Sequence, residues 1–249
     1  MAVRENIVEN SAARDAYVRG TLLLKAESSG VTTASLGILS RSGVPSQDLS
    51  TWDLFVYWHM RAMLDRGPGG RNSAHSVPVF LPWHRWMLIL LEEHLQRVLG
   101  DDDFGLPYWD WAADGEFSAT EQLNQPVWNV ANMGGNGRAS DREVTNGPFR
   151  RTGPFKIKIE GTPFPAMPIR ATNRGLRRSL GANPEINTLP QKSDVELAIS
   201  GRTYDSSPWN AGSRSMRNFV EGWTPEPPKH AQPRARLDWG RYGTGQFSK

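Results

Sequence analysis

The sequence predicts a mainly α-helical domain with long loops and little β-structure. Three observations support this fold class. Several segments repeat apolar residues at helical spacing, 18 prolines and 24 glycines imply many loops, and only one short segment has the character of a strand. With 249 residues, 10 tryptophans and 9 phenylalanines, the chain is long enough and apolar enough to bury a substantial core.

The first two helices are predicted from an apolar run and from a start signal. The segment 11–26 has helical periodicity and no interior proline, and a polar connection then runs to about Gln47. Ser50 and Asp53 are three residues apart just before an apolar run, which is the pattern of a capping box. We therefore expect a second helix from there to about Asp65.

The second helix and a third one each carry a histidine on an apolar stripe. Phe55, His59 and Met63 are spaced by four, which places His59 on the apolar face of its helix. Proline suits the first turn of the third helix, predicted over 82–99, and His84 lies near its start. The residues that share a face with it are Leu88, Leu91 and Leu95. Both histidines are therefore expected to point inward.

Beyond the third helix the chain is expected to be rich in loops. One short strand is predicted over 155–159, and two shorter helices over 194–199 and 213–223.

Composition excludes several classes of site and partner. There is no cysteine, so disulfides, zinc ribbons, thiol nucleophiles and iron–sulfur clusters are ruled out, and any metal must be held by imidazole or carboxylate. The formal net charge is +3 with no basic stripe, and we expect no nucleic-acid partner. No run approaches the roughly 18 apolar residues of a membrane span, and the start of the chain lacks an apolar secretory stretch. We therefore expect a soluble, cytoplasmic protein without a membrane partner, unless a partner protein exports it.

Three histidines are the candidate metal ligands. His59 and His84 lie on predicted helices, and His75 lies in the loop between them, sixteen residues after the first and nine before the last. Neutral imidazoles bind copper, zinc, iron and nickel, although spacing alone leaves a metal site and a set of buried structural histidines equally open. His94 lies about 80° around the helix from His84, at the edge of the apolar stripe, and is better explained as structural. His230 follows a stretch without periodicity and is predicted to lie in a loop.

The segment 80–85, which reads Phe-Leu-Pro-Trp-His-Arg and follows two histidines, resembles the bacterial tyrosinases. These are type 3 copper proteins related to catechol oxidases, o-aminophenol oxidases and haemocyanins. Further segments that resemble the family, in the family's order, are 58–59, 106–111, 146–149, 176–181 and 217–223. The resemblance covers 12–223.

This resemblance implies a helical bundle that holds two coppers between facing helices. The first copper would be bound by His59, His75 and His84. Glu221 matches a family glutamate thought to help a water molecule deprotonate the bound phenol, a general-base role, although a surface acid at a helix end explains it equally well. The implied activity is the oxidation of phenols, o-diphenols or o-aminophenols to quinones with dioxygen, and the choice among these substrates stays open. Some relatives need a small copper-delivering helper protein that also exports them.

The chain departs from the family where the second copper site should be written. The family has a His-Asn-Arg-Val-His segment and a later His-His segment, and neither occurs here. Read one nucleotide later, codons that fit 230–239 can encode Met-His-Asn-Arg-Val-His-Val-Trp-Ile-Gly. Codons that fit 240–249 can encode Gly-Asp-Met-Ala-Leu-Gly-Ser-Ser-Pro-Asn. We hypothesise that one extra nucleotide near the codon of Lys229 puts the tail out of frame.

Under this hypothesis 1–223 is the first-copper half of a tyrosinase-like domain, and 224–249 is an anomalous, disordered tail. The second half of the bundle would be missing, only the first copper site would be complete, and the chain as translated would be inactive. The uncovered helix faces would expose an apolar patch that carries Phe55, Met63, Leu88, Leu91 and Leu95. Two alternatives are a non-catalytic oxygen carrier or metal-binding protein of the haemocyanin kind, and an inert pseudogene product.

Overall fold

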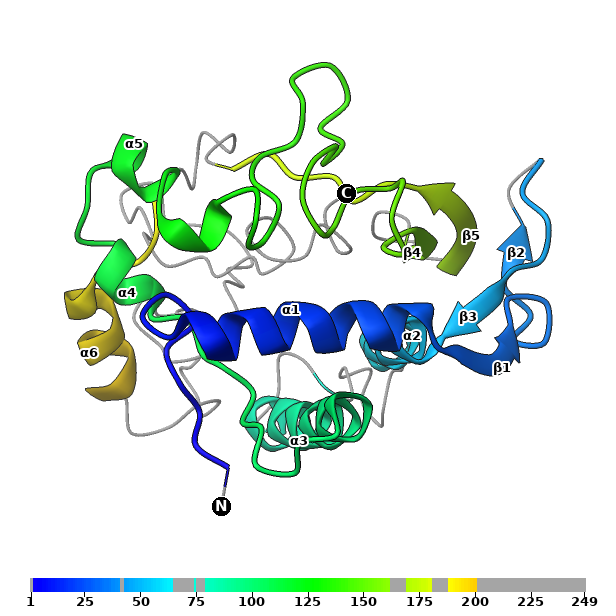
Figure 1. The fold of residues 1–249 in the computed structure, drawn as a ribbon, viewed down its shortest axis with the longest axis horizontal. Helices are drawn as coiled ribbons and strands as arrows, with labels where there is room; N and C mark the ends of the chain where they lie inside the picture. Colours follow the sequence, from blue (N-terminus) through cyan, green and yellow to red (C-terminus); the bar gives the residue numbers. More distant parts are fainter. Residues whose placement is uncertain are drawn as a thin grey trace, which may run out of the picture.

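The structure is a computed structural model. It describes residues 2–40, 43–64, 74, 79–161, 169–180 and 188–200. Three helices form its centre: α1 (Ser11–Ala26), α2 (Thr51–Leu64) and α3 (Phe80–Leu99). Figure 1 shows α1 running across the molecule, with α3 seen nearly end-on on one side of it and the loop-rich segments on the other. Helix α1 contacts both of the other helices.

Each of these helices begins or ends at a residue that satisfies its free backbone groups. The side chain of Asn10 accepts a hydrogen bond from the N–H of Ala13 at 3.0 Å, so α1 has the predicted bounds. Ser50 and Asp53 form the predicted capping box, because each backbone N–H donates to the other side chain, at 3.0 and 3.1 Å. Helix α3 starts two residues earlier than predicted and ends at Gly100, whose φ of 66° is left-handed.

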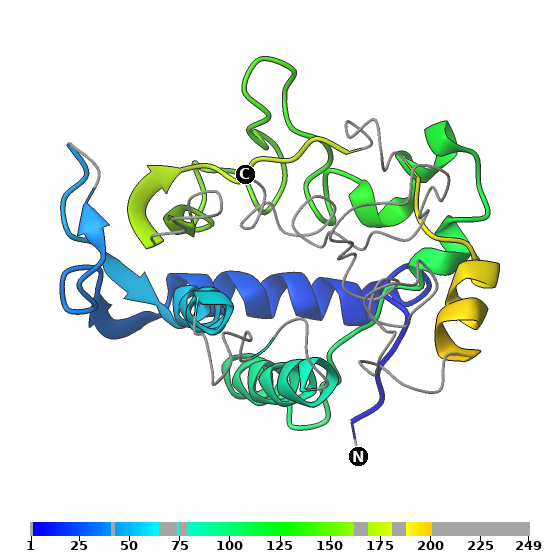
Figure 2. The same ribbon diagram turned by 180° about the vertical axis from the view of Figure 1, so that it is seen from behind.

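Two small sheets lie at one end of α1, as Figure 2 shows from behind. In the first sheet, β1 (Ser28–Thr32) pairs antiparallel with β3 (Asp48–Ser50). In the second, β5 (Ile169–Arg174) lies between β2 (Leu39–Ser40), to which it is parallel, and β4 (Ile157–Gly161), to which it is antiparallel.

The predicted strand over 155–159 is confirmed as β4, two residues later along the chain. The prediction that the segment up to Gln47 is a polar connection without strands is wrong, because β1 and β2 lie within it. Their partners are β3 and β5, so the pairing that makes these short polar segments strands cannot be read from the segments alone.

Short helical turns complete the described chain. They are α4 (Trp111–Asp114), α5 (Ala119–Gln122), the 3₁₀ turn η2 (Pro126–Trp128) and α6 (Lys192–Ser200). The last confirms the helix predicted over 194–199. The helix predicted over 213–223 and the tail 224–249 lie outside the described residues. The fold is mainly helical with little β-structure, as predicted, and no helix in the described part of the chain is long and apolar enough to cross a membrane.

The inward faces of α2 and α3 are covered over part of their length. Phe55 and Leu95 are buried, with 4% and 0% of their surface exposed, so the expectation that both would be exposed is wrong. The reason is local packing: the edge of the His94 ring contacts Phe55, and α1 approaches α3 closely at Gly20. Leu88 is 41% exposed, which agrees with the predicted open face nearer the start of α3.

Candidate metal centre

The predicted histidines of the two helices meet. His59 lies near the end of α2 and His84 near the start of α3, and their Nε2 atoms are 3.3 Å apart. The two rings are nearly edge-on, with centroids 5.4 Å apart. His75 lies outside the described residues, so the third ligand of the predicted triad stays a prediction.

The hydrogen bonding of His84 sets which ring nitrogen carries the proton and which the lone pair. Its Nδ1–H donates to the carbonyl oxygen of Phe80, one turn earlier on α3, at 2.7 Å. A carbonyl can only accept, so the proton of the neutral ring is on Nδ1 and the lone pair is on Nε2. That lone pair faces His59, and the backbone of α3 fixes the ring in this orientation.

Both rings are held in the neutral form that binds metals. Burial, and to a lesser extent the nearby His84, together lower the pKa of His59 to about 4. Burial also lowers the pKa of His84, although the hydrogen bond to the Phe80 carbonyl opposes this. At neutral pH neither ring carries a proton on both nitrogens, so each keeps one nitrogen with a lone pair.

The spacing of the two nitrogens also fits a shared ion. Two imidazole nitrogens that bind one ion tetrahedrally, each at about 2.0 to 2.1 Å, lie roughly 3.3 Å apart. His59 and His84 show this separation. Imidazole is a good ligand for copper, so the residues present fit the metal that the sequence predicts.

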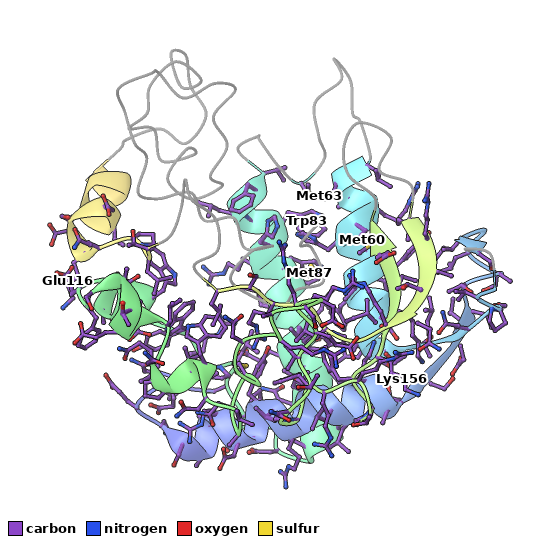
Figure 3. All side chains as sticks on the ribbon, turned by 90° about the horizontal axis from the view of Figure 1, so that it is seen from above. Met60, Met63, Trp83, Met87, Glu116 and Lys156 are labelled. Carbon is purple, nitrogen blue, oxygen red and sulfur yellow. The ribbon has the colours of Figure 1, made fainter. Side chains whose placement is uncertain are left out.

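Aromatic side chains surround the pair. The ring centroid of Trp83 is 4.8 Å from that of His84 and 5.7 Å from that of His59, and Phe80 lies 4.2 Å from His84. Figure 3 shows Trp83 in the space between α2 and α3. These rings place apolar surface against the imidazoles. Neither aromatic residue was expected to contact the histidines, although Phe80 is four residues and Trp83 one residue before His84.

Of the other candidate residues, one has contacts elsewhere and two lie outside the described residues. His94 donates its Nδ1–H to the carbonyl of Leu90 at 2.9 Å and contacts Phe55, so its structural role is confirmed. Glu221 and His230 lie outside the described residues. Within the described ranges no three histidine, aspartate or glutamate side chains come together as a metal site.

Comparisons with known proteins identify the family. A family model described as the common central domain of tyrosinase matches residues 49–232. A tyrosinase of Streptomyces antibioticus is 35% identical over 203 residues, covering 80% of this chain and 64% of the relative. The grixazone synthase of Streptomyces griseus is 38% identical over 192 residues, covering 70% and 58%. A 5,6-dihydroxyindole-2-carboxylic acid oxidase of Carassius auratus is 31% identical over 197 residues, covering 72% and 35%.

The fold and the comparisons therefore place the chain in a class of proteins, the type 3 copper proteins. The chain is a member of the tyrosinase family. It spans between 56% and 64% of the length of the Streptomyces tyrosinases that it matches.

Proposed function

We propose that this chain binds copper at His59, His75 and His84 and that the intact protein is an oxidase of phenols or o-diphenols. The observation that carries the proposal is the pair of neutral imidazoles with facing Nε2 atoms 3.3 Å apart, inside the segment that matches the tyrosinase domain. The family implies two coppers, which together supply the two-electron exchange with dioxygen that converts a phenol or o-diphenol to a quinone.

The chain's own residues prepare the site for that chemistry. The Phe80 carbonyl holds the lone pair of His84 toward His59. Burial keeps both rings in the neutral form, and the ring of Trp83 packs against both of them. The capping box at Ser50 and Asp53 fixes the start of the helix that carries His59. These contacts position the ligands before any metal binds.

The relatives support an oxidase and a phenolic substrate class. One relative is named for the oxidation of a dihydroxyindole carboxylic acid and another as a synthase. None of the relatives reported above is named as an oxygen carrier, so we place the enzyme before the carrier. The helper protein for copper delivery stays a prediction.

We further propose that the tail 224–249 is translated out of frame and that the chain as translated holds the first copper only. The match to the family model ends at residue 232, where the segment with the second-copper histidines is expected. Resequencing of the coding region around Lys229 tests this. Codons there that cannot encode the His-Asn-Arg-Val-His segment one nucleotide later would reject it.

The function is tested by copper content per chain and by oxygen uptake with catechol. Both are measured on the 249-residue chain and on a version with one nucleotide removed near the codon of Lys229. We expect one copper and no turnover in the first, and two coppers with turnover in the second. His59→Ala should lose the copper of the 249-residue chain, and His94→Ala should keep it. Catechol oxidation by the 249-residue chain, or copper retained by His59→Ala, would contradict the proposal.

A further inference from the structure

The outer face of α1 forms an apolar groove with the turn that contains Pro154. The groove has a volume of about 500 Å³, and all but two of its lining residues are apolar. Those on α1 are Asp15, Val18, Arg19, Leu22, Leu23 and Ala26. Figure 3 shows α1 along the lower edge of the molecule. The groove shares no residue with the histidine pair or with the aromatic side chains around it.

The groove lies on the side of α1 opposite its buried side. With 3.6 residues per turn, Asp15, Leu22 and Ala26 fall within about 40° of one another around the helix. The fully buried Leu24 lies about 180° from Asp15. Leu23 is 42% exposed, and Ala26 is exposed as well. The second half of this helix face is therefore apolar and open, although the solvent side of a helix is normally polar.

The two charged residues of this face are available to a second molecule. The side chain of Asp15 is 76% exposed, and its carboxylate lies 3.7 Å from Arg14 Nε. Arg19 is exposed and forms no ion pair within the described part of the chain. Opposite charges four residues apart on a helix can pair with each other, but Asp15 and Arg19 do not. The face therefore carries one acid and one base, each with room for a further partner.

An antiparallel second copy of α1 complements this face. If a twofold axis passes through the middle of the helix, the first turn of one copy faces the last turn of the other. The small, exposed Ala12 then lies opposite Leu23 and Ala26 of the second copy, where it permits close packing. Arg19 of each copy lies about 4.5 Å along the helix axis from Asp15 of the other, within reach of an ion pair. A twofold contact makes each of these interactions twice.

We propose that this chain forms a reversible dimer in which the outer faces of α1 from two copies pack antiparallel. The α1 helix of the second copy occupies the groove, which removes Leu22 and Leu23 from water and pairs Arg19 with Asp15 across the axis. One helix from each copy buries less than the roughly 800 Å² per partner of a standard stable interface, so the dimer dissociates on dilution. The inference is independent of the proposed copper function.

Because the chain has no cysteine, introduced thiols test the register directly. Ala12→Cys and Ala26→Cys variants of the 249-residue chain are prepared separately, mixed, and oxidised with diamide. In the antiparallel pair, residue 12 of one copy lies beside residue 26 of the other. Identical positions lie roughly 20 Å apart along the helix axis, too far for a disulfide. We expect a covalent dimer in the mixture and almost none in either variant alone.

Sedimentation velocity measures the strength of the dimer. Leu23→Asp should weaken it at least about 10-fold, because a carboxylate would be buried in the apolar contact. The matched control is Leu123→Asp, since Leu123 is 38% exposed and lies outside the groove, and it should dimerise like the wild type. Asp15→Arg should also weaken the dimer about 10-fold, because like charges would then meet across the axis. Arg19→Asp added to Asp15→Arg exchanges the two charges and should restore most of the affinity.

Three outcomes would overturn the dimer. The first is a wild-type chain that stays monomeric up to about 0.1 mM. The second is a disulfide that forms as readily in the separate cysteine variants as in their mixture. The third is a Leu23→Asp variant that dimerises like the wild type. If a monomeric wild type binds an apolar fluorescent dye and Leu23→Asp does not, the groove instead takes a small apolar ligand. Circular dichroism confirms that each variant is folded before it is compared.

Discussion

A buried ion pair joins α1 to α2, the helix that carries His59. Substitution of one of its partners should lower the free energy of unfolding more than most other substitutions. The ammonium group of Lys25 on α1 forms an ion pair with Asp53 Oδ1 on α2, and the two side chains are 0% and 1% exposed. The other carboxylate oxygen of Asp53 accepts from the N–H and the hydroxyl of Ser50, at 3.0 and 2.7 Å. Burial lowers the pKa of Lys25, and the Asp53 charge opposes that shift.

Asp53→Ala would leave the ammonium of Lys25 buried without its counter-charge and would open the capping box. Removal of one partner from a buried ion pair costs about 3 to 5 kcal/mol, and loss of the cap adds about 1 kcal/mol. Domains of this size are stable by roughly 5 to 15 kcal/mol. The variant should therefore lose a large part of the free energy of unfolding.

Urea unfolding followed by circular dichroism measures this loss. The matched control is Lys25→Met combined with Asp53→Asn, which removes both charges and keeps an oxygen that can accept from Ser50. We expect the control to recover most of the stability, because uncharged replacements of a buried pair are often neutral. A loss below about 1 kcal/mol in Asp53→Ala, or a control that is less stable than Asp53→Ala, would refute the reasoning.

Three further predictions concern helix packing, pH and a second buried cation. Gly20→Ala should lower the free energy of unfolding by about 1 to 3 kcal/mol in urea, because the new Cβ would lie 2.8 Å from Leu95, which is fully buried. The stability of the metal-free chain should fall between pH 6.5 and about 4, because the folded pKa of His59 lies near 4, below its ordinary value of 6.5, and the unfolded state takes up the proton first. Urea midpoints should fall less over this range in His59→Gln. Arg178→Lys should unfold at lower urea than the wild type, because the guanidinium donates to two backbone carbonyls and lies 5.2 Å over the ring of Trp128, a geometry that an ammonium does not match. An unchanged urea midpoint in Gly20→Ala would contradict the close approach of Gly20 to Leu95. An unchanged midpoint in Arg178→Lys would contradict the role of the guanidinium contacts.

The helices could be predicted because their signals are local. The bounds of α1 follow from periodicity, and the start of α2 follows from two residues three apart that cap each other. The strands could not be predicted equally well. Only β4 has an apolar pattern of its own, and β2 pairs with β5 at Leu39 and Arg170, so its structure depends on a partner far along the chain.

The meeting of two of the predicted histidines could be anticipated from the sequence, whereas their aromatic surroundings could not. The spacing that puts His59 and His84 on apolar stripes is periodic, and the structure brings their nitrogens together. The contacts of Trp83 with both rings depend on how α2 crosses α3, which no periodicity reports. Lys25 follows three leucines near the end of a helix, where a lysine usually extends to solvent, and its burial depends on Asp53 of another helix.

Contacts that join the two histidine-bearing helices to each other and to α1 lie away from the histidines themselves. At the opposite ends of the helices, Glu27 accepts two hydrogen bonds from Arg97 of α3, at 2.8 and 2.9 Å, and one from Thr51 of α2. The buried ion pair of Lys25 and Asp53, two residues further along α2, joins α1 to α2. Because these anchors are protein contacts only, the two histidines proposed as copper ligands should stay in place without metal. Loss of a ligand should therefore abolish copper binding while leaving the cooperative unfolding of the helices nearly unchanged.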